Sequence, residues 1–226
     1  MSEMLLYLYF LLGLVPFGLL LAKKSSTAFQ AFPIIPLIWL IFISTLYEFL
    51  FSYVLKVDAR YWFRLYTLLE FAAAYCYFRG ILPNYSKALN LSLFAYLIVF
   101  SCFLSFWDLE TSMRDESYLS VLSTVFVAAA SLLWFKDIFS SGTSEPVTRS
   151  PDFYFICGLL LFFLGTLCLY LLGDDILKSS GLEILKYWNL AIFFNVVLRL
   201  LVSVGTCKLV FKMGTKSSNG GQIKYF

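Results

Sequence analysis

The chain has 226 residues, of which 61% are hydrophobic, 20% aromatic and only 14% charged, with a net charge of +3 and no histidine. A typical soluble domain has about 45–50% apolar and about 25% charged residues, and a soluble fold of this length could not bury so much apolar surface. Abundant aromatics, no short repeat and only five cysteines exclude disordered, collagen-like, coiled-coil and disulfide-scaffold proteins.

Seven stretches are apolar and long enough to cross a bilayer, which takes roughly 20 residues per helix. The gaps between them hold no further domain, and no alternating ten-residue segments typical of a barrel appear. The sequence therefore predicts an all-α integral membrane protein, a single seven-transmembrane-helix bundle over residues 1–213 with a flexible cytoplasmic tail at 214–226. The predicted helices are 4–22, 33–55, 61–78, 89–107, 118–135, 153–172 and 187–207.

Turn-forming and charged residues separate these stretches. Lys23 and Lys24 follow the first span, which lacks the basic start and the cleavage site of a signal peptide and is expected to be retained. Gly173 and the two aspartates after it are expected to end the sixth helix, and residues 174–186 form a candidate short surface helix. The cysteines all lie in spans and are expected to be buried free thiols.

The distribution of basic residues predicts the orientation. With the N-terminus outside, ten lysines and arginines of the loops and tails lie on the cytoplasmic side and five on the outer side. We expect a multi-pass protein of the cell inner (cytoplasmic) membrane with its C-terminus in the cytoplasm. The basic charge follows this topology, so no nucleic-acid partner is predicted. The ten inner residues are Lys23, Lys24, Arg79, Lys87, Lys136, Arg149, Lys208, Lys212, Lys216 and Lys224.

The missing residue types exclude several chemistries. Without histidine there is no histidine-ligated haem, no histidine-containing zinc site and no Ser-His triad. The last span carries Arg199 rather than a mid-membrane lysine, so a retinal Schiff base is not expected. We predict no metal, no cofactor and no catalytic residue set.

Four ionisable residues remain inside the predicted spans: Glu48, Arg64, Glu70 and Arg199. Each costs about 2.5–3.5 kcal/mol on insertion scales, so each needs a partner or a function. If their role is structural, Glu70 is predicted to pair with Arg199 and Glu48 with Arg64. Together with Asn195 these four are the candidate ligand-binding or polar-cluster residues, supported by Ser44, Tyr66, Thr67 and Asn189.

These groups allow three interpretations. In the first interpretation they are structural, with ion pairs and with Ser, Thr and Asn side chains cross-linking helices. In the second they line a polar pocket that is open to the outer side and binds a small ligand or ion. In the third interpretation they move protons or substrate across the membrane. Gly158 and Gly165 on the sixth helix predict close helix packing.

Several short motifs resemble a group of small bacterial seven-transmembrane-helix proteins without an established activity. The motifs are Tyr47-Glu48, Tyr66-Thr67-Leu68-Leu69-Glu70-Phe71, Pro151-Asp152-Phe153-Tyr154 with Cys157-Gly158, and the pair Asn189 and Asn195. The resemblance covers nearly the whole chain and implies a signalling role only by association.

Our leading hypothesis is a ligand-sensing or signal-relay module whose basic inner loops meet a cytoplasmic signalling partner, with the lipid bilayer as its surroundings. The alternative is a small solute or proton-coupled transporter, although no inverted repeat is visible. An intramembrane hydrolase using the two glutamates as acid and base is less favoured, because no nucleophile accompanies them. The sequence does not define an oligomeric state.

Overall fold

The computed structural model describes residues 2–22, 32–55, 60–105, 112–140, 146–177 and 181–217. Within these ranges all regular structure is helical and no strand occurs. This confirms the predicted all-α class.

Each predicted apolar stretch overlaps one α-helix of the structure. Five helices among the described residues are long and apolar enough to cross a membrane, whereas α2 is shorter and α3 more polar. The chain therefore has the helices of a membrane protein. The elements are α1 Ser2–Ala22, α2 Ile35–Tyr47, the π-helix η2 Glu48–Val54, α3 Arg60–Ile81, the 3₁₀-helix η3 Pro83–Tyr85, α4 Ser86–Ser105, α5 Ser112–Ser140, the 3₁₀-helix η4 Val147–Arg149, α6 Pro151–Leu177 and α7 Gly181–Ser217.

The ends of α6 and α7 differ from the prediction. Helix α6 continues through Gly173 to Leu177, and α7 begins at Gly181, so the expected separate surface helix over 174–186 does not form among the described residues. Helix α7 also runs on to Ser217, into the predicted tail, whose remaining residues 218–226 lie outside the described ranges. A single glycine costs a helix only about 1 kcal/mol relative to alanine, and neither segment contains a proline.

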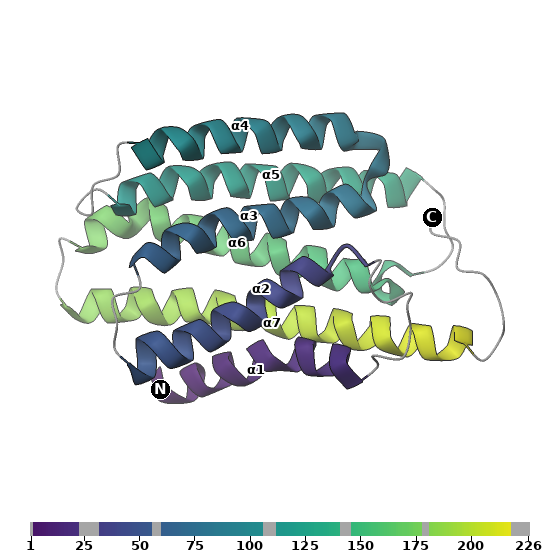
Figure 1. Ribbon diagram of the computed structural model, residues 1–226, viewed down its shortest axis with the longest axis horizontal. Helices are drawn as coiled ribbons and strands as arrows, with labels where there is room; N and C mark the ends of the chain where they lie inside the picture. The colour runs from purple at the N-terminus through teal and green to yellow at the C-terminus, as the bar shows by residue number, and fades with distance from the viewer. Residues whose placement is uncertain are drawn as a thin grey trace.

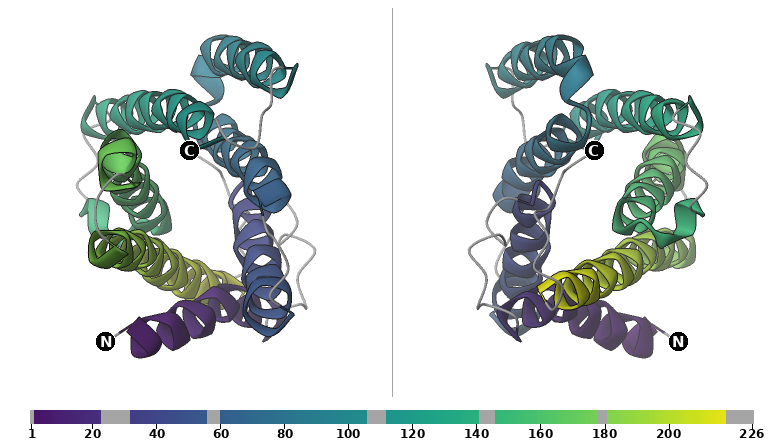
Figure 2. Two further views of the ribbon diagram at one scale, coloured as in Figure 1. Left: turned by 90° about the vertical axis from the view of Figure 1, so that its left-hand side faces the viewer. Right: turned by 90° about the vertical axis from the view of Figure 1, so that its right-hand side faces the viewer.

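Consecutive helices run in opposite directions along the bundle (Figure 1). Viewed from its ends, α1, α2, α3, α5, α6 and α7 form a ring, and the contact between α1 and α7 closes it (Figure 2). Helix α4 lies outside this ring, packed on α3 and α5. The first and last helices, far apart in the sequence, are therefore neighbours.

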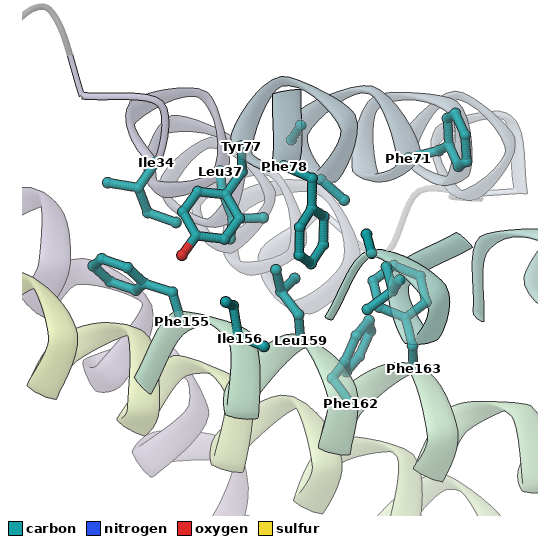
Figure 3. Close-up of a cluster of buried hydrophobic side chains, with 14 of the residues drawn as sticks. Ile34, Leu37, Phe71, Tyr77, Phe78, Phe155, Ile156, Leu159, Phe162 and Phe163 are labelled. Atoms are coloured by element: carbon teal, nitrogen blue, oxygen red, sulfur yellow. The ribbon is translucent and has the colours of Figure 1, made fainter. Parts of the chain in front are cut away.

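Large apolar side chains fill the space between the helices. Tyr77 and Phe78 of α3 point toward Phe155 and Leu159 of α6, with Leu37 of α2 beside them (Figure 3). All five are at least nine-tenths buried. This core joins α2, α3 and α6 across the ring and holds the bundle together at the end where α3 finishes.

The outer surface of the bundle is apolar. On α4, Leu91 and Phe94 are 69% and 63% exposed, and similar side chains are exposed on every described α-helix. Buried hydroxyls, which we expected to cross-link helices, mostly donate to the carbonyl four residues earlier in their own helix. Examples are Ser123, Ser131, Thr166, Ser203 and Thr206. Apolar groups outside and self-satisfied hydroxyls inside suit a lipid solvent.

The cysteines are free, as expected, but not all are buried. Cys76, Cys102 and Cys168 are exposed, and Cys157 and Cys207 are half-buried. The expectation of buried thiols is therefore wrong for three of them. The reason is that a small apolar thiol is equally compatible with a lipid-facing surface, which composition cannot distinguish from a core.

The glycines of α6 allow close helix packing, as predicted. A Cβ on Gly165 would meet the ring of Phe194 in α7, and one on Gly158 would lie 3.2 Å from Cβ of Leu201 in α7. Both glycines therefore face α7 and let its side chains approach the α6 backbone.

Candidate functional site

Arg199 connects three helices. It lies on α7 and is 1% exposed. Its Nη1 donates to the backbone carbonyl of Tyr9 in α1 at 2.9 Å and to the Oγ1 of Thr45 in α2 at 2.8 Å. Its guanidinium carbon also lies 3.4 Å from the centroid of the Tyr9 ring, a cation–π contact. One buried cation thus binds α1 and α2 to α7.

Glu48 lies where α2 changes into a π-helix. Its carboxylate accepts a hydrogen bond from the Oγ of Ser44, one turn earlier, at 2.8 Å and another from the hydroxyl of Tyr9. Its backbone N–H donates to the carbonyls of both Ser44 and Thr45, four and three residues earlier, a shared bond that is common where an α-helix ends. π-Helical segments are rare and are often found at functional sites.

Tyr9 therefore contacts both charged groups. Its hydroxyl donates to Glu48, while its ring and its carbonyl contact Arg199. Among the described residues, the contacts of Arg199 are with a carbonyl, a hydroxyl and an aromatic ring, not with Glu70 as predicted. Arg199 and Glu48 are each satisfied by neutral groups, and a tyrosine, which the sequence analysis missed, connects them.

A glycine on α1 makes this arrangement fit. Gly13, one turn after Tyr9, is buried, and a Cβ added there would run into the Oγ1 of Thr45 and the Nη1 of Arg199. The close approach of α1 to both side chains thus requires a residue without a side chain.

Glu70 joins this group through a second tyrosine. Tyr66, one turn earlier on α3, is a side-chain hydrogen-bond partner of Glu70. The Tyr66 hydroxyl also lies close enough to Tyr9, Glu48 and Arg199 to interact with them electrostatically. We call the residues that these interactions bring together the polar cluster. Its members are Tyr9, Ser44, Thr45, Glu48, Tyr66, Glu70 and Arg199.

Four predicted residues lie elsewhere. Arg64 is 3% exposed and acts electrostatically on Tyr96 of α4, and the carbonyl of Thr67 accepts the Tyr96 hydroxyl at 3.3 Å. Asn195 donates to the carbonyl of Ala191 in its own helix at 3.2 Å, and Asn189 lies further toward the start of α7, half-buried. Their positions in the sequence put these four residues on the same helices as the charged groups, but sequence spacing does not define where their side chains point.

A second set of polar contacts fastens the end of the bundle where α3, α5 and α7 finish. Lys208 of α7 donates to the carbonyl of Thr148 at 2.8 Å and to the hydroxyl of Tyr154 at 2.9 Å. Tyr77 of α3 donates to the carboxylate of Asp152 at 3.0 Å. These bonds tie α7 and α3 to the segment that leads into α6, and the sequence analysis did not anticipate them.

The polar cluster is rich in groups that can exchange hydrogen bonds. Its only charged members are two glutamates and one arginine, and among the described residues no three His, Cys, Asp or Glu side chains gather to hold a metal ion. Tyrosine and serine hydroxyls can each both donate and accept.

The chain matches no family model, no curated protein and no solved structure. The resemblance to small bacterial seven-helix proteins stays a prediction. A functional assignment has to come from the geometry of the polar cluster.

Proposed function

We propose that this chain is a seven-helix membrane protein with its N-terminus outside and its C-terminus in the cytoplasm, and that the polar cluster is the sensing site of a signal-relay module. The observation that carries the proposal is the position of Tyr9, which contacts both Glu48 and Arg199 and so connects α1, η2 and α7. A ligand or partner that alters one of these contacts would therefore alter the packing of all three helices against one another.

Helix α7 supplies a path from this cluster to the other end of the bundle. It is continuous from Gly181 to Ser217, and Lys208 lies nine residues after Arg199, roughly 14 Å along the axis at 1.5 Å per residue. Lys208 is bonded to η4 and to the start of α6. A shift of α7 at the polar cluster would therefore move the basic loops at the proposed cytoplasmic face, where a signalling partner would bind.

Ligand binding is the direct test of sensing. Purified protein in lipid nanodiscs is screened against ligand panels by thermal shift, and Glu70→Gln is compared with Asp137→Asn, a matched carboxylate-to-amide change. Asp137 bonds Tyr85 at 3.0 Å, outside the polar cluster. We expect a ligand-dependent rise in melting temperature of about 5–11 °C at 100 times the dissociation constant. It should persist in Asp137→Asn and disappear in Glu70→Gln.

Two results would contradict the sensing proposal. One is a protein that responds to no ligand and co-purifies with no partner. The other is pH-dependent solute uptake into liposomes that is lost in Glu48→Gln or Glu70→Gln, which would favour the transporter, whose proton path would use the same carboxylates and tyrosine hydroxyls.

The proposed topology has its own test. A green fluorescent protein fused after residue 226 is expected to fluoresce in cells, and alkaline phosphatase at the same position to be inactive. The same reporters inserted between residues 106 and 111 should give the reverse result, because four spans precede that loop in the proposed arrangement. Equal reporter activity at both positions would mean that an even number of spans separates them.

A further inference from the structure

Tyr9 lies between two buried groups of opposite charge. Arg199 is almost fully buried, yet among the described residues its partners are a carbonyl, a hydroxyl and an aromatic ring, none of them charged. The carboxylate of Glu48 is likewise held by two hydroxyls, from Ser44 and Tyr9. Opposite charges attract strongly where water is excluded, so a direct pair is the natural competing arrangement.

We propose that Tyr9 is a displaceable spacer: when α1 moves outward, Arg199 and Glu48 form a direct ion pair that draws α7 toward η2. This inference rests on the proposed sensing function and names the movement that regulates the polar cluster. The module then has two states, one with α1 bound through Tyr9 and one with the charges joined.

Helix α1 is suited to such a movement. Its surface is widely exposed, with Met4 at 82% and Leu11 at 62%, and α2 and α7 are its main neighbours. Of the described α1 residues only Leu20 belongs to the buried central core. The start of α1 can therefore shift without opening the α2–α3–α6 core.

The element that carries Glu48 is also loosely packed on its outer side. Phe49, Leu50 and Phe51 of the π-helix are all exposed, at 39–47%. π-Helical turns have a wider winding than α-helical ones, and interconversion of the two at Glu48 would reorient its carboxylate. Both sides of the proposed ion pair thus have room to approach.

The test measures how close α1 stays to η2 in the absence of any ligand. In the full chain with its five cysteines replaced by serine, Phe10→Cys and Phe49→Cys introduce thiols at rings whose centroids are 5.3 Å apart. The rate of reaction with a short bismaleimide is then followed in membranes. Tyr9→Phe removes only the hydroxyl, and Tyr118→Phe, at an exposed position of α5, is the control.

We expect Tyr9→Phe to slow cross-linking about fivefold, the factor that about 1 kcal/mol for one lost hydrogen bond corresponds to, while Tyr118→Phe leaves the rate unchanged. Adding Glu48→Gln to Tyr9→Phe should restore the rate, because no ion pair with Arg199 can then form. An unchanged rate in Tyr9→Phe, or a slow rate that Glu48→Gln does not restore, would overturn the spacer.

A second variant tests the proposal if the Tyr9→Phe protein does not accumulate in the membrane. Thr45→Val keeps the side-chain shape but removes the hydroxyl that accepts from Arg199, and it should also slow cross-linking. An unchanged rate there would equally overturn the proposal. Because no ligand is present, these outcomes are independent of the ligand-shift experiment. If the cross-linking rates contradict the spacer but the ligand still raises the melting temperature, only the spacer is wrong and the proposed sensing function holds.

Discussion

Changing Gly13 to alanine is expected to lower the free energy of unfolding by about 2–4 kcal/mol. The added methyl group would occupy the space of the Thr45 Oγ1 and the Arg199 Nη1, so α1 has to move outward or the hydrogen bond between those two atoms has to break. Overpacking alone typically costs about 1–3 kcal/mol, and a hydrogen bond to a charged group contributes about 1.5–3 kcal/mol. Thermal or denaturant unfolding of purified protein in nanodiscs measures the change.

The same helix offers a matched control. Gly18 lies five residues further along α1, and a Cβ there would meet no atom within 4 Å beyond the neighbouring backbone of its own helix. Gly18→Ala should therefore leave stability unchanged or raise it by up to about 1 kcal/mol, the difference in helix propensity between the two residues. Equal destabilisation by both substitutions would mean that Gly13 is not needed for contact between α1, Thr45 and Arg199.

The helices were predictable because lipid and water select different side chains. Each apolar stretch gave one α-helix, with a π-helix added in the second, since a run of about 20 apolar residues has few other ways to satisfy its backbone. Helix ends were less predictable. The stretch from Gly173 to Leu177 reads as a turn by composition, but its backbone continues α6, because glycine and aspartate weaken a helix without preventing it.

The candidate site was predictable in part. The cost of charge in hydrocarbon identified Glu48, Glu70 and Arg199, and one-turn spacing identified Ser44 and Tyr66 as their neighbours. Both rules act within one helix or on one residue at a time.

Partners on other helices were not predictable in this way. Tyr9 and Arg199 are separated by 190 positions, and only the closure of the ring between α1 and α7 brings them together. In the sequence Tyr9 is one aromatic residue in an apolar helix rich in them. The signal that was available is the small residue one turn later, Gly13, which allows another helix to approach.

The predicted pair of Glu70 with Arg199 did not form because the rule of opposite charges ignores neutral competitors. A carbonyl, a hydroxyl and an aromatic face together satisfy Arg199 without placing a second charge in the interior. Removing two ions from water carries a cost that a pair often barely recovers. A tyrosine that serves both charges is thus a reasonable alternative to a direct pair, and it leaves the pair as a second state.

The second large effect is expected from Arg199→Lys, which should lower stability by about 2–3 kcal/mol and more than Arg199→Met does. A lysine keeps a buried positive charge, but its compact ammonium lacks the planar fork that lets arginine reach the Tyr9 carbonyl, the Thr45 hydroxyl and the Tyr9 ring together. Methionine removes the charge and with it most of the penalty of leaving an ion poorly satisfied.

Unfolding measurements on both variants give the order, with Arg79→Lys as the control. Arg79 is exposed and donates to Tyr75 at 3.2 Å and to the side chain of Asn90; because these bonds lie in an exposed position, its substitution should change stability by less than about 0.5 kcal/mol. The reverse order, with methionine the less stable variant, would mean that the charge itself stabilises the bundle. In that case Arg199 would be paired with a carboxylate in the resting protein, and Glu48 would be the first candidate, since Tyr9 already links the two.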